Sequence, residues 1–205
     1  MADDYGSMIA RIEDEIADST LTAQVKLAIQ DAIKYYSRER WYFTEAIDTF
    51  ATVASTQNYN LPSDFKGMER MRLTYTSATY WELTPRSFDY INNITTINTV
   101  TGPPQDYAIF AEQVYLYPIP NGVYTVTRYY NKQLTQLSAD ASTNAWMVDG
   151  EELIRTRAKW DLMLHLIREF DEADRLKQAE VEAYQNLKGS STIREVQGRI
   201  TPVYL

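Results

Sequence analysis

The sequence predicts an α+β protein in which two helical ends enclose a β-rich middle. Apolar residues recur at helical spacing over residues 7–40 and again over residues 149–188. Thirteen of the sixteen tyrosines lie within residues 35–130, and six of the seven prolines lie within residues 62–120. This composition favours strands and turns over helices.

The expected organisation has three parts, and 205 residues are enough to give it a sizeable core. The parts are a helical bundle of residues 1–41 and 133–189, an antiparallel, sandwich-like insert of residues 42–132, and an extended C-terminal arm of residues 190–205.

Two helices are expected before the insert. A short amphipathic helix begins near Ser7, which suits an N-cap, and ends at residues 18–20. A longer helix follows, with an apolar stripe that steps by three or four residues from Leu21 to Tyr36. Residues 1–20 are acidic and residues 21–40 are net positive. We interpret these charges as patches that meet on neighbouring copies of the chain, and the alternative is a solvated surface.

About six strands are expected in the insert, because short runs rich in aromatic and β-branched residues alternate with turn residues. Met71, Leu73 and Tyr75 should share one face of a strand. Pro85 suits the first turn of a short helix, and residues 92–101 suit a loop. The strands are expected at residues 43–53, 69–76, 80–84, 107–110, 114–117 and 124–130. Five tyrosines on the last strands are expected to form one patch: Tyr115, Tyr117, Tyr124, Tyr129 and Tyr130.

The C-terminal helical region is expected to begin at Asp149, with Glu152 completing a capping box. Residues 169–171 suit a kink or break, and Gly189 suits the position after the last turn. The final residues have no helical periodicity but keep apolar side chains, which a disordered tail usually lacks. We therefore expect an arm that binds a partner, and the alternative is an arm that wraps back on its own subunit. Its candidate contacts are Ile193, Val196, Ile200, Val203 and Tyr204.

Composition argues against most catalytic and metal sites. The chain has no cysteine and a single histidine, which cannot supply the several nitrogen or sulfur ligands of a typical transition-metal site. His165 lies between two leucines, so a core or interface role is expected. We expect no catalytic residues, no cofactor and no metal. The net charge of −8 lacks the basic face of general DNA-binding proteins, and no apolar run is long enough to span a membrane.

The order of several motifs resembles one family. Residues 29–43, 59–65 and 102–109 carry it, and residues 114–120 and 134–146 continue it. Together with the terminal helices, these segments resemble the head-to-tail adaptor (connector) proteins of tailed bacteriophages, the family of tail tubular protein A and other portal adaptors. The resemblance extends over nearly the whole chain.

The resemblance implies a structural virion protein rather than an enzyme. Members form a homo-oligomeric ring, typically of twelve copies, between the portal protein and the tail or nozzle protein. The ring extends the channel through which double-stranded DNA passes without sequence-specific binding. The expected location is the head–tail junction of the virion, after assembly in the host cytoplasm and with no membrane partner.

The same reading assigns partner contacts to two regions. The C-terminal arm is expected to dock on the portal or on a neighbouring subunit. Arg38, Arg40 and Trp41 are expected where the helices join the insert, at a place where subunits can meet. Two other functions stay open: another tail-completion or stopper component, and a glycan-binding or hydrolytic accessory protein that uses the aromatic sheet. A hydrolase of that kind would need a cleft with two carboxyl groups about 5–9 Å apart.

Overall fold

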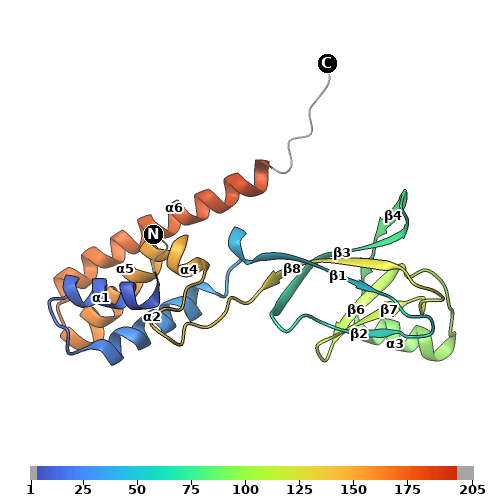
Figure 1. Cartoon of the computed structure of the whole chain (residues 1–205), viewed down its shortest axis with the longest axis horizontal. Coiled ribbons are helices and arrows are strands. Elements are labelled where there is room, and N and C mark those ends of the chain that lie inside the picture. Colours follow the sequence, from blue (N-terminus) through green and yellow to red (C-terminus); the bar gives the residue numbers. More distant parts are fainter. Residues whose placement is uncertain (1–3, 198–205) are drawn as a thin grey trace, which may run out of the picture. The chain divides into compact units, whose positions relative to one another are not determined.

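A computed structural model describes residues 4–197 and divides the chain into two compact units (Figure 1). The helical unit comprises Met1–Thr44 and Leu134–Leu205, and the β unit comprises Glu45–Gln133. The insert was expected at residues 42–132, so the β unit begins three residues later and ends one residue later than expected. The mixture of terminal helices and a β-rich middle confirms the predicted α+β class.

The helical unit packs its long helices around one apolar core. Its elements are α1 (Tyr5–Glu15), α2 (Thr22–Tyr36), the 3-10 turn η1 (Tyr42–Thr44), α4 (Ala145–Val148), α5 (Glu151–Leu162), the π-helical turn η2 (Met163–Ile167) and α6 (Phe170–Gln197). Helix α5 lies against both α2 and α6. The predicted stripe of α2 is confirmed, since Val25, Ile29 and Ala32 are buried. The predicted break near residue 169 is also present, because Arg168 has left-handed backbone angles (φ 66°) and ends η2.

The β unit contains eight strands in two four-stranded sheets, rather than about six. The strands are β1 (Glu45–Ala51), β2 (Asn58–Asn60), β3 (Phe65–Thr76), β4 (Thr79–Glu82), β5 (Thr84–Pro85), β6 (Asp106–Phe110), β7 (Gln113–Tyr117) and β8 (Thr125–Lys132). The first sheet has the order β1-β8-β3-β4 and the second the order β2-β7-β6-β5. All pairs are antiparallel except β5 with β6, which is parallel.

Apolar side chains from both sheets form one core, so the unit is a sandwich as predicted. Met71, Leu73 and Val126 of the first sheet meet Val114 and Leu116 of the second, and all five are fully buried. The alternation predicted for β3 is confirmed at Met71 and Leu73. Tyr75, near the end of the strand, is 50% exposed, and its ring packs on Trp81 and Tyr124 at the margin of the same core.

The expected tyrosine patch is wrong, because neighbouring residues of a strand point to opposite faces of the sheet. Tyr130 is buried and stacks on Phe65, whereas Tyr129 lies beneath the guanidinium of Arg70. Tyr115 belongs to the second sheet and packs edge-to-face on Phe88 of a helix.

Several predicted helix ends are wrong because other residues supply the caps. Helix α1 is capped by Asp4, whose carboxylate accepts a 2.7 Å hydrogen bond from the Ser7 backbone N–H. Asp149 does not cap α5, which begins two residues later. Its carboxylate instead accepts a 2.6 Å bond from the Tyr42 hydroxyl, and burial together with this bond raises the pKa of Tyr42 to about 12.

Two segments are helical where extended chain or loop was expected. Helix α3 (Phe88–Ile97), capped by Ser87, occupies much of the expected loop at residues 92–101, and Pro85 lies in β5 rather than in a first helical turn. Helix α6 passes through Gly189 to Gln197, so the extended arm is wrong for residues 190–197. Ser191 is buried there, which shows that this part of α6 still packs on the helical unit.

A buried carboxylate joins α6 to the two helices beside it. Glu180 is 2% exposed and bonds Arg157 of α5 (2.9 Å), Lys177 (2.9 Å) and the Tyr36 hydroxyl of α2. Burial alone would raise the pKa of Glu180, but these three donors together hold it below its usual value. The Tyr36 hydroxyl has the opposite shift, because burial and then its bond to Glu180 raise its pKa.

Two glycines predict substitutions of opposite sign. A Cβ at Gly150 would lie 2.6 Å from the ring of Trp146, which is itself buried, so Gly150→Ala should lower the free energy of unfolding by about 1–3 kcal/mol. A Cβ at Gly189, which lies inside α6, would have no other atom within 4 Å. Gly189→Ala should therefore raise the free energy of unfolding by about 0.5–1 kcal/mol. Urea unfolding of both variants measures the two values, and a stabilised Gly150→Ala would contradict the tight contact.

Glu180→Gln should lower the free energy of unfolding at pH 7 by about 3 kcal/mol, because it leaves Arg157 and Lys177 without their shared carboxylate. The pKa of folded Glu180 lies below the ordinary 4.5, so ionised Glu180 stabilises the fold above pH 4.5. The advantage of the wild type should therefore shrink as the pH falls through the folded pKa. Exposed Glu182→Gln on the same helix is the control, with a change of about 0.5 kcal/mol or less. A deficit that persists unchanged at low pH would contradict this assignment.

Candidate interaction surfaces

Trp41, which was expected at a subunit contact, is a core residue. It is completely buried, and its indole N–H donates a 2.9 Å bond to the backbone carbonyl of Tyr36. Its ring stacks on Phe43 and meets Trp146 edge-on at 5.6 Å. The expectation of an exposed Trp41 is therefore wrong, because the turn after α2 folds its side chain inward among other aromatic rings.

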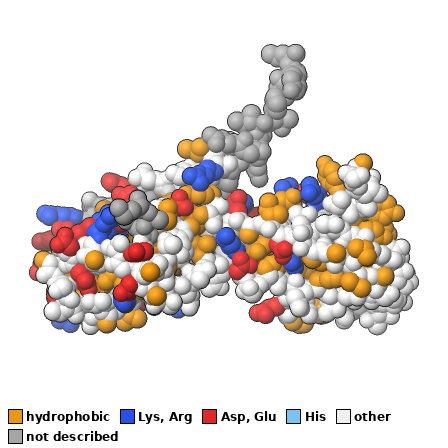
Figure 2. Space-filling model, in the orientation of Figure 1, with side chains coloured by type: hydrophobic (Ala, Val, Ile, Leu, Met, Phe, Trp, Pro, Cys, Tyr) orange, Lys and Arg blue, Asp and Glu red, His pale blue; other side chains and the backbone are white. Residues whose placement is uncertain are grey.

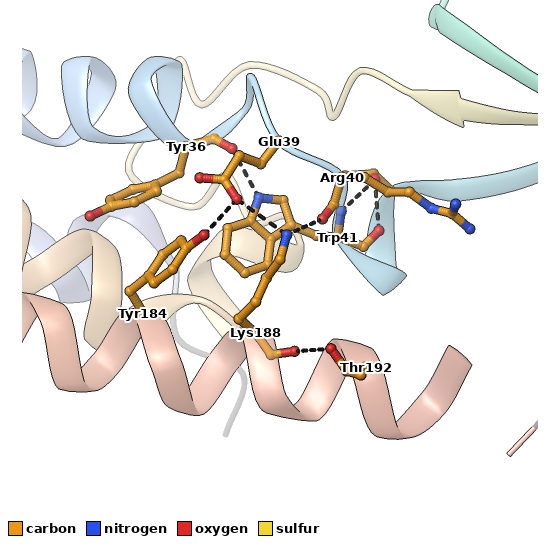
Figure 3. Close-up of polar contacts among 8 residues, drawn as sticks. Tyr36, Glu39, Arg40, Trp41, Tyr184, Lys188 and Thr192 are labelled. Carbon is orange, nitrogen blue, oxygen red and sulfur yellow. Dashed lines mark hydrogen bonds and ion pairs between the residues drawn. The ribbon is translucent and has the colours of Figure 1, made fainter. Parts of the chain in front are cut away.

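Polar bonds hold α6 over this aromatic cluster (Figure 3). The Glu39 carboxylate accepts bonds from the Tyr184 hydroxyl at 2.9 Å and from the Lys188 ammonium at 3.2 Å. The Lys188 ammonium also lies 5.0 Å from the centre of the Trp41 ring, a cation–π contact. The bond to Glu39 and then burial raise the pKa of Tyr184. Arg40, by contrast, is an exposed residue beside this junction.

Arg38 lies at a surface pocket between α2 and α5. The pocket has a volume of about 270 Å³ and a floor that includes Ala28 and Ala32. Its polar lining carries both signs of charge: Asp31, Lys34, Arg38, Arg157 and Asp161. Arg157 is not available to a partner, because its guanidinium lies over Tyr35 (4.4 Å) and Trp160 (4.3 Å) and pairs with Glu180. Exposed Arg38 is available to one.

One acidic residue of the first helix is already paired within the unit. Glu15 pairs with both Arg155 and Lys159 of α5, and these partners hold its pKa below the usual value although burial opposes them. At the start of α2, Lys26 pairs with Asp140. Of the charges that the sequence assigned to a contact between α1 and α2 of neighbouring copies, Glu15 and Lys26 are therefore already used inside the chain.

The outer face of the first sheet carries arginines stacked on tyrosines. Arg70 lies 4.1 Å from the ring centre of Tyr129, and Arg72 lies 5.1 Å from that of Tyr80. Tyr80 is 63% exposed, and Ile47, opposite Tyr129 in the sheet register, is 68% exposed. Exposed arginine and tyrosine together are typical of protein interfaces. Figure 2 shows hydrophobic side chains on the surface of the β unit and a denser mixture of charges on the helical unit.

The expected arm residues fall at the end of the described chain. Ile193 is 60% exposed on α6. Val196 is in the last turn of that helix. The other expected contacts, Ile200, Val203 and Tyr204, lie outside the described residues.

Within the described part of the chain, no cluster of three or more His, Asp or Glu residues could hold a metal ion. His165 is not in the core: its side chain is 65% exposed on η2, 3.7 Å from the carboxylate of Asp161. A search of the described helices for a membrane-spanning segment finds none of sufficient length and apolar character. The features that stand out are thus exposed surfaces on each unit.

The comparisons with known proteins give the chain a family. None of the curated proteins matches it. A family model described as SU10 adaptor protein matches residues 3–203, nearly the whole chain. Adaptors of this kind are structural components of phage particles and not an enzyme class, in agreement with the surfaces described above. The chain belongs to the SU10 adaptor protein family.

Proposed function

We propose that the chain forms a closed ring of about twelve copies between the portal and the tail of a phage, in the manner of tail tubular protein A. In this position it extends the DNA channel from the head and presents a docking surface to the tail or nozzle protein. The match of the adaptor family over residues 3–203 is the observation that carries the proposal.

The surfaces of the two units support this role. A closed ring of identical subunits needs two different, complementary patches on each copy, and further surfaces for the portal and the tail. The helical unit exposes unpaired charges on α2, and the β unit exposes the arginine–tyrosine face of its first sheet. The net charge of −8 suits a channel that lets DNA pass without gripping its phosphates.

Mixing the purified 23.7 kDa chain with isolated portal rings should give a particle heavier by about twelve copies. Mass photometry measures the added mass, and negative-stain images of the same sample locate it on the portal. A chain that stays separate from the portal but binds a preassembled portal–adaptor complex would be a stopper or tail-completion protein instead. Either that result or a soluble monomer under all conditions would contradict the proposal.

The residues after Gln197 should contribute to portal attachment. Deleting residues 198–205 removes Ile200, Val203 and Tyr204 but leaves α6, including the buried Ser191, intact. The shortened chain should keep its free energy of unfolding and lose portal attachment by about tenfold or more, as expected when several apolar anchors are removed. Replacing the same eight residues by a glycine–serine segment of equal length is the control for length. Equal attachment by all three chains would overturn the assignment of the arm.

A further inference from the structure

Two exposed stripes on the helical unit have the same spacing. The first, here called the α2 stripe, consists of Leu27, Asp31 and Lys34 of α2 and of Arg38, which lies in the turn two residues after the helix ends; the spacing is four, three and four residues. The second, the α6 stripe, consists of Phe170, Asp174, Lys177 and Val181, with the same spacing. Steps of three and four residues keep all the members of a stripe on one side of a helix. The α6 stripe can therefore meet another helix along about three turns, and the helical part of the α2 stripe along about two, with Arg38 in the turn that follows.

The stripes are open surface, although they contain large apolar side chains. Leu27 is 61% exposed on α2, and Phe170 and Val181 are 60% and 47% exposed on α6. Among the described residues, the side chains of Lys34, Arg38 and Asp174 form no hydrogen bond or ion pair. Lys177, which pairs with Glu180, still has 47% of its side chain exposed. Exposed apolar residues among unpaired charges are what a helix contact with a partner requires.

When the two stripes are placed antiparallel, every position meets a complementary one. Leu27 meets Val181 as an apolar pair, and Lys34 meets Asp174 as an ion pair. Asp31 then meets Lys177, and the guanidinium of Arg38 meets the ring of Phe170 as a cation–π pair. Among the described residues, no ion pair uses Asp31, Lys34, Arg38 or Asp174, whereas Lys177 keeps its internal bond to Glu180 and offers only its exposed part. The complementarity therefore points to a second copy as the occupant.

We propose that the α2 stripe of one copy packs antiparallel on the α6 stripe of the next copy, with Leu27 opposite Val181 and Lys34 opposite Asp174. The contact joins two different patches, so each copy uses both, one toward each neighbour. Closure of such contacts into a ring rests on the proposed function, but the pairing of the two stripes does not. One contact between two short stripes is small and therefore weak by itself. In a ring, each copy makes this contact with both of its neighbours.

The absence of cysteine from the sequence allows a direct test by disulfide trapping. Leu27→Cys and Val181→Cys are made in separate full-length chains, mixed in equal amounts and oxidised, alone and with portal rings. The mixture should give a covalent dimer that neither variant gives by itself, because opposed residues of packed helices bring their Cα atoms within about 7 Å. The matched control mixes Leu27→Cys with Gln185→Cys, an exposed position one turn further along α6. Equal dimer yields in the two mixtures, with and without portal, would overturn the proposal.

Charge reversal tests the register independently of the apolar pair. Lys34→Glu in the Leu27→Cys chain, or Asp174→Lys in the Val181→Cys chain, should lower the rate of cross-linking by about tenfold, and combining the two should restore it. Reversals that leave the rate unchanged would show that Lys34 and Asp174 do not face each other.

A chain that carries both cysteines separates this inference from the proposed ring. Oxidation should give a ladder of covalent oligomers, since each copy contacts two neighbours. A product that stops at the dimer would keep the pairing of the stripes and contradict the ring. A ladder together with failure to attach to portal rings would keep the stripes and contradict the placement of the ring at the portal.

Discussion

The helical unit depends on the burial of Trp41. This unit is made from two stretches of sequence, and the β unit of 89 residues lies between them. Trp41 comes from the first stretch, and its ring contacts Trp146 and Tyr184 of the second. Its indole N–H, the polar atom that burial would otherwise leave unsatisfied, is bonded to the Tyr36 carbonyl. Apolar area, ring packing and a satisfied donor thus act together at Trp41, which lies in the short segment between the end of α2 at Tyr36 and the start of the β unit at Glu45.

The β unit can be inserted between the two stretches of the helical unit because its own two ends lie side by side. Strand β1 begins at Glu45 and β8 ends at Lys132, and the antiparallel register pairs Glu45 with Asn131. The entering and leaving chains are therefore neighbours, so the insert adds little strain to the two-part helical core. An insert with this arrangement can vary in its loops without disturbing Trp41 or the Glu180 bonds. Each unit can consequently carry its own contact surface.

The sequence predicted the elements with strong periodicity and missed those that depend on distant partners. The stripe of α2 and strands β6, β7 and β8 follow from local patterns, and all of them are present. Asp149 is a good local N-cap, yet the hydroxyl of distant Tyr42 occupies its carboxylate and the helix starts later. Gly189 is a good helix stop, yet the packing of α6 continues past it to buried Ser191. Tertiary contacts thus overrode local preference at both ends of the C-terminal helical region.

The candidate interaction surfaces also depend on tertiary contacts that the sequence does not reveal. Sequence charge suggested that the acidic first helix meets the basic second helix of a neighbour, but Glu15 and Lys26 have partners inside the chain. Of the residues expected at a subunit contact, Arg38 is exposed, while Trp41, three residues later, belongs to the core. A sequence gives the total charge of a segment, and only the fold tells which of those charges are already paired. The charges without an internal pair include Lys34 of α2, Arg38 just after that helix and Asp174 of α6, and these three have a definite spacing. Unpaired charges of this kind suit an interface between copies best, because charges paired inside a subunit would have to share or lose one partner before they gained another.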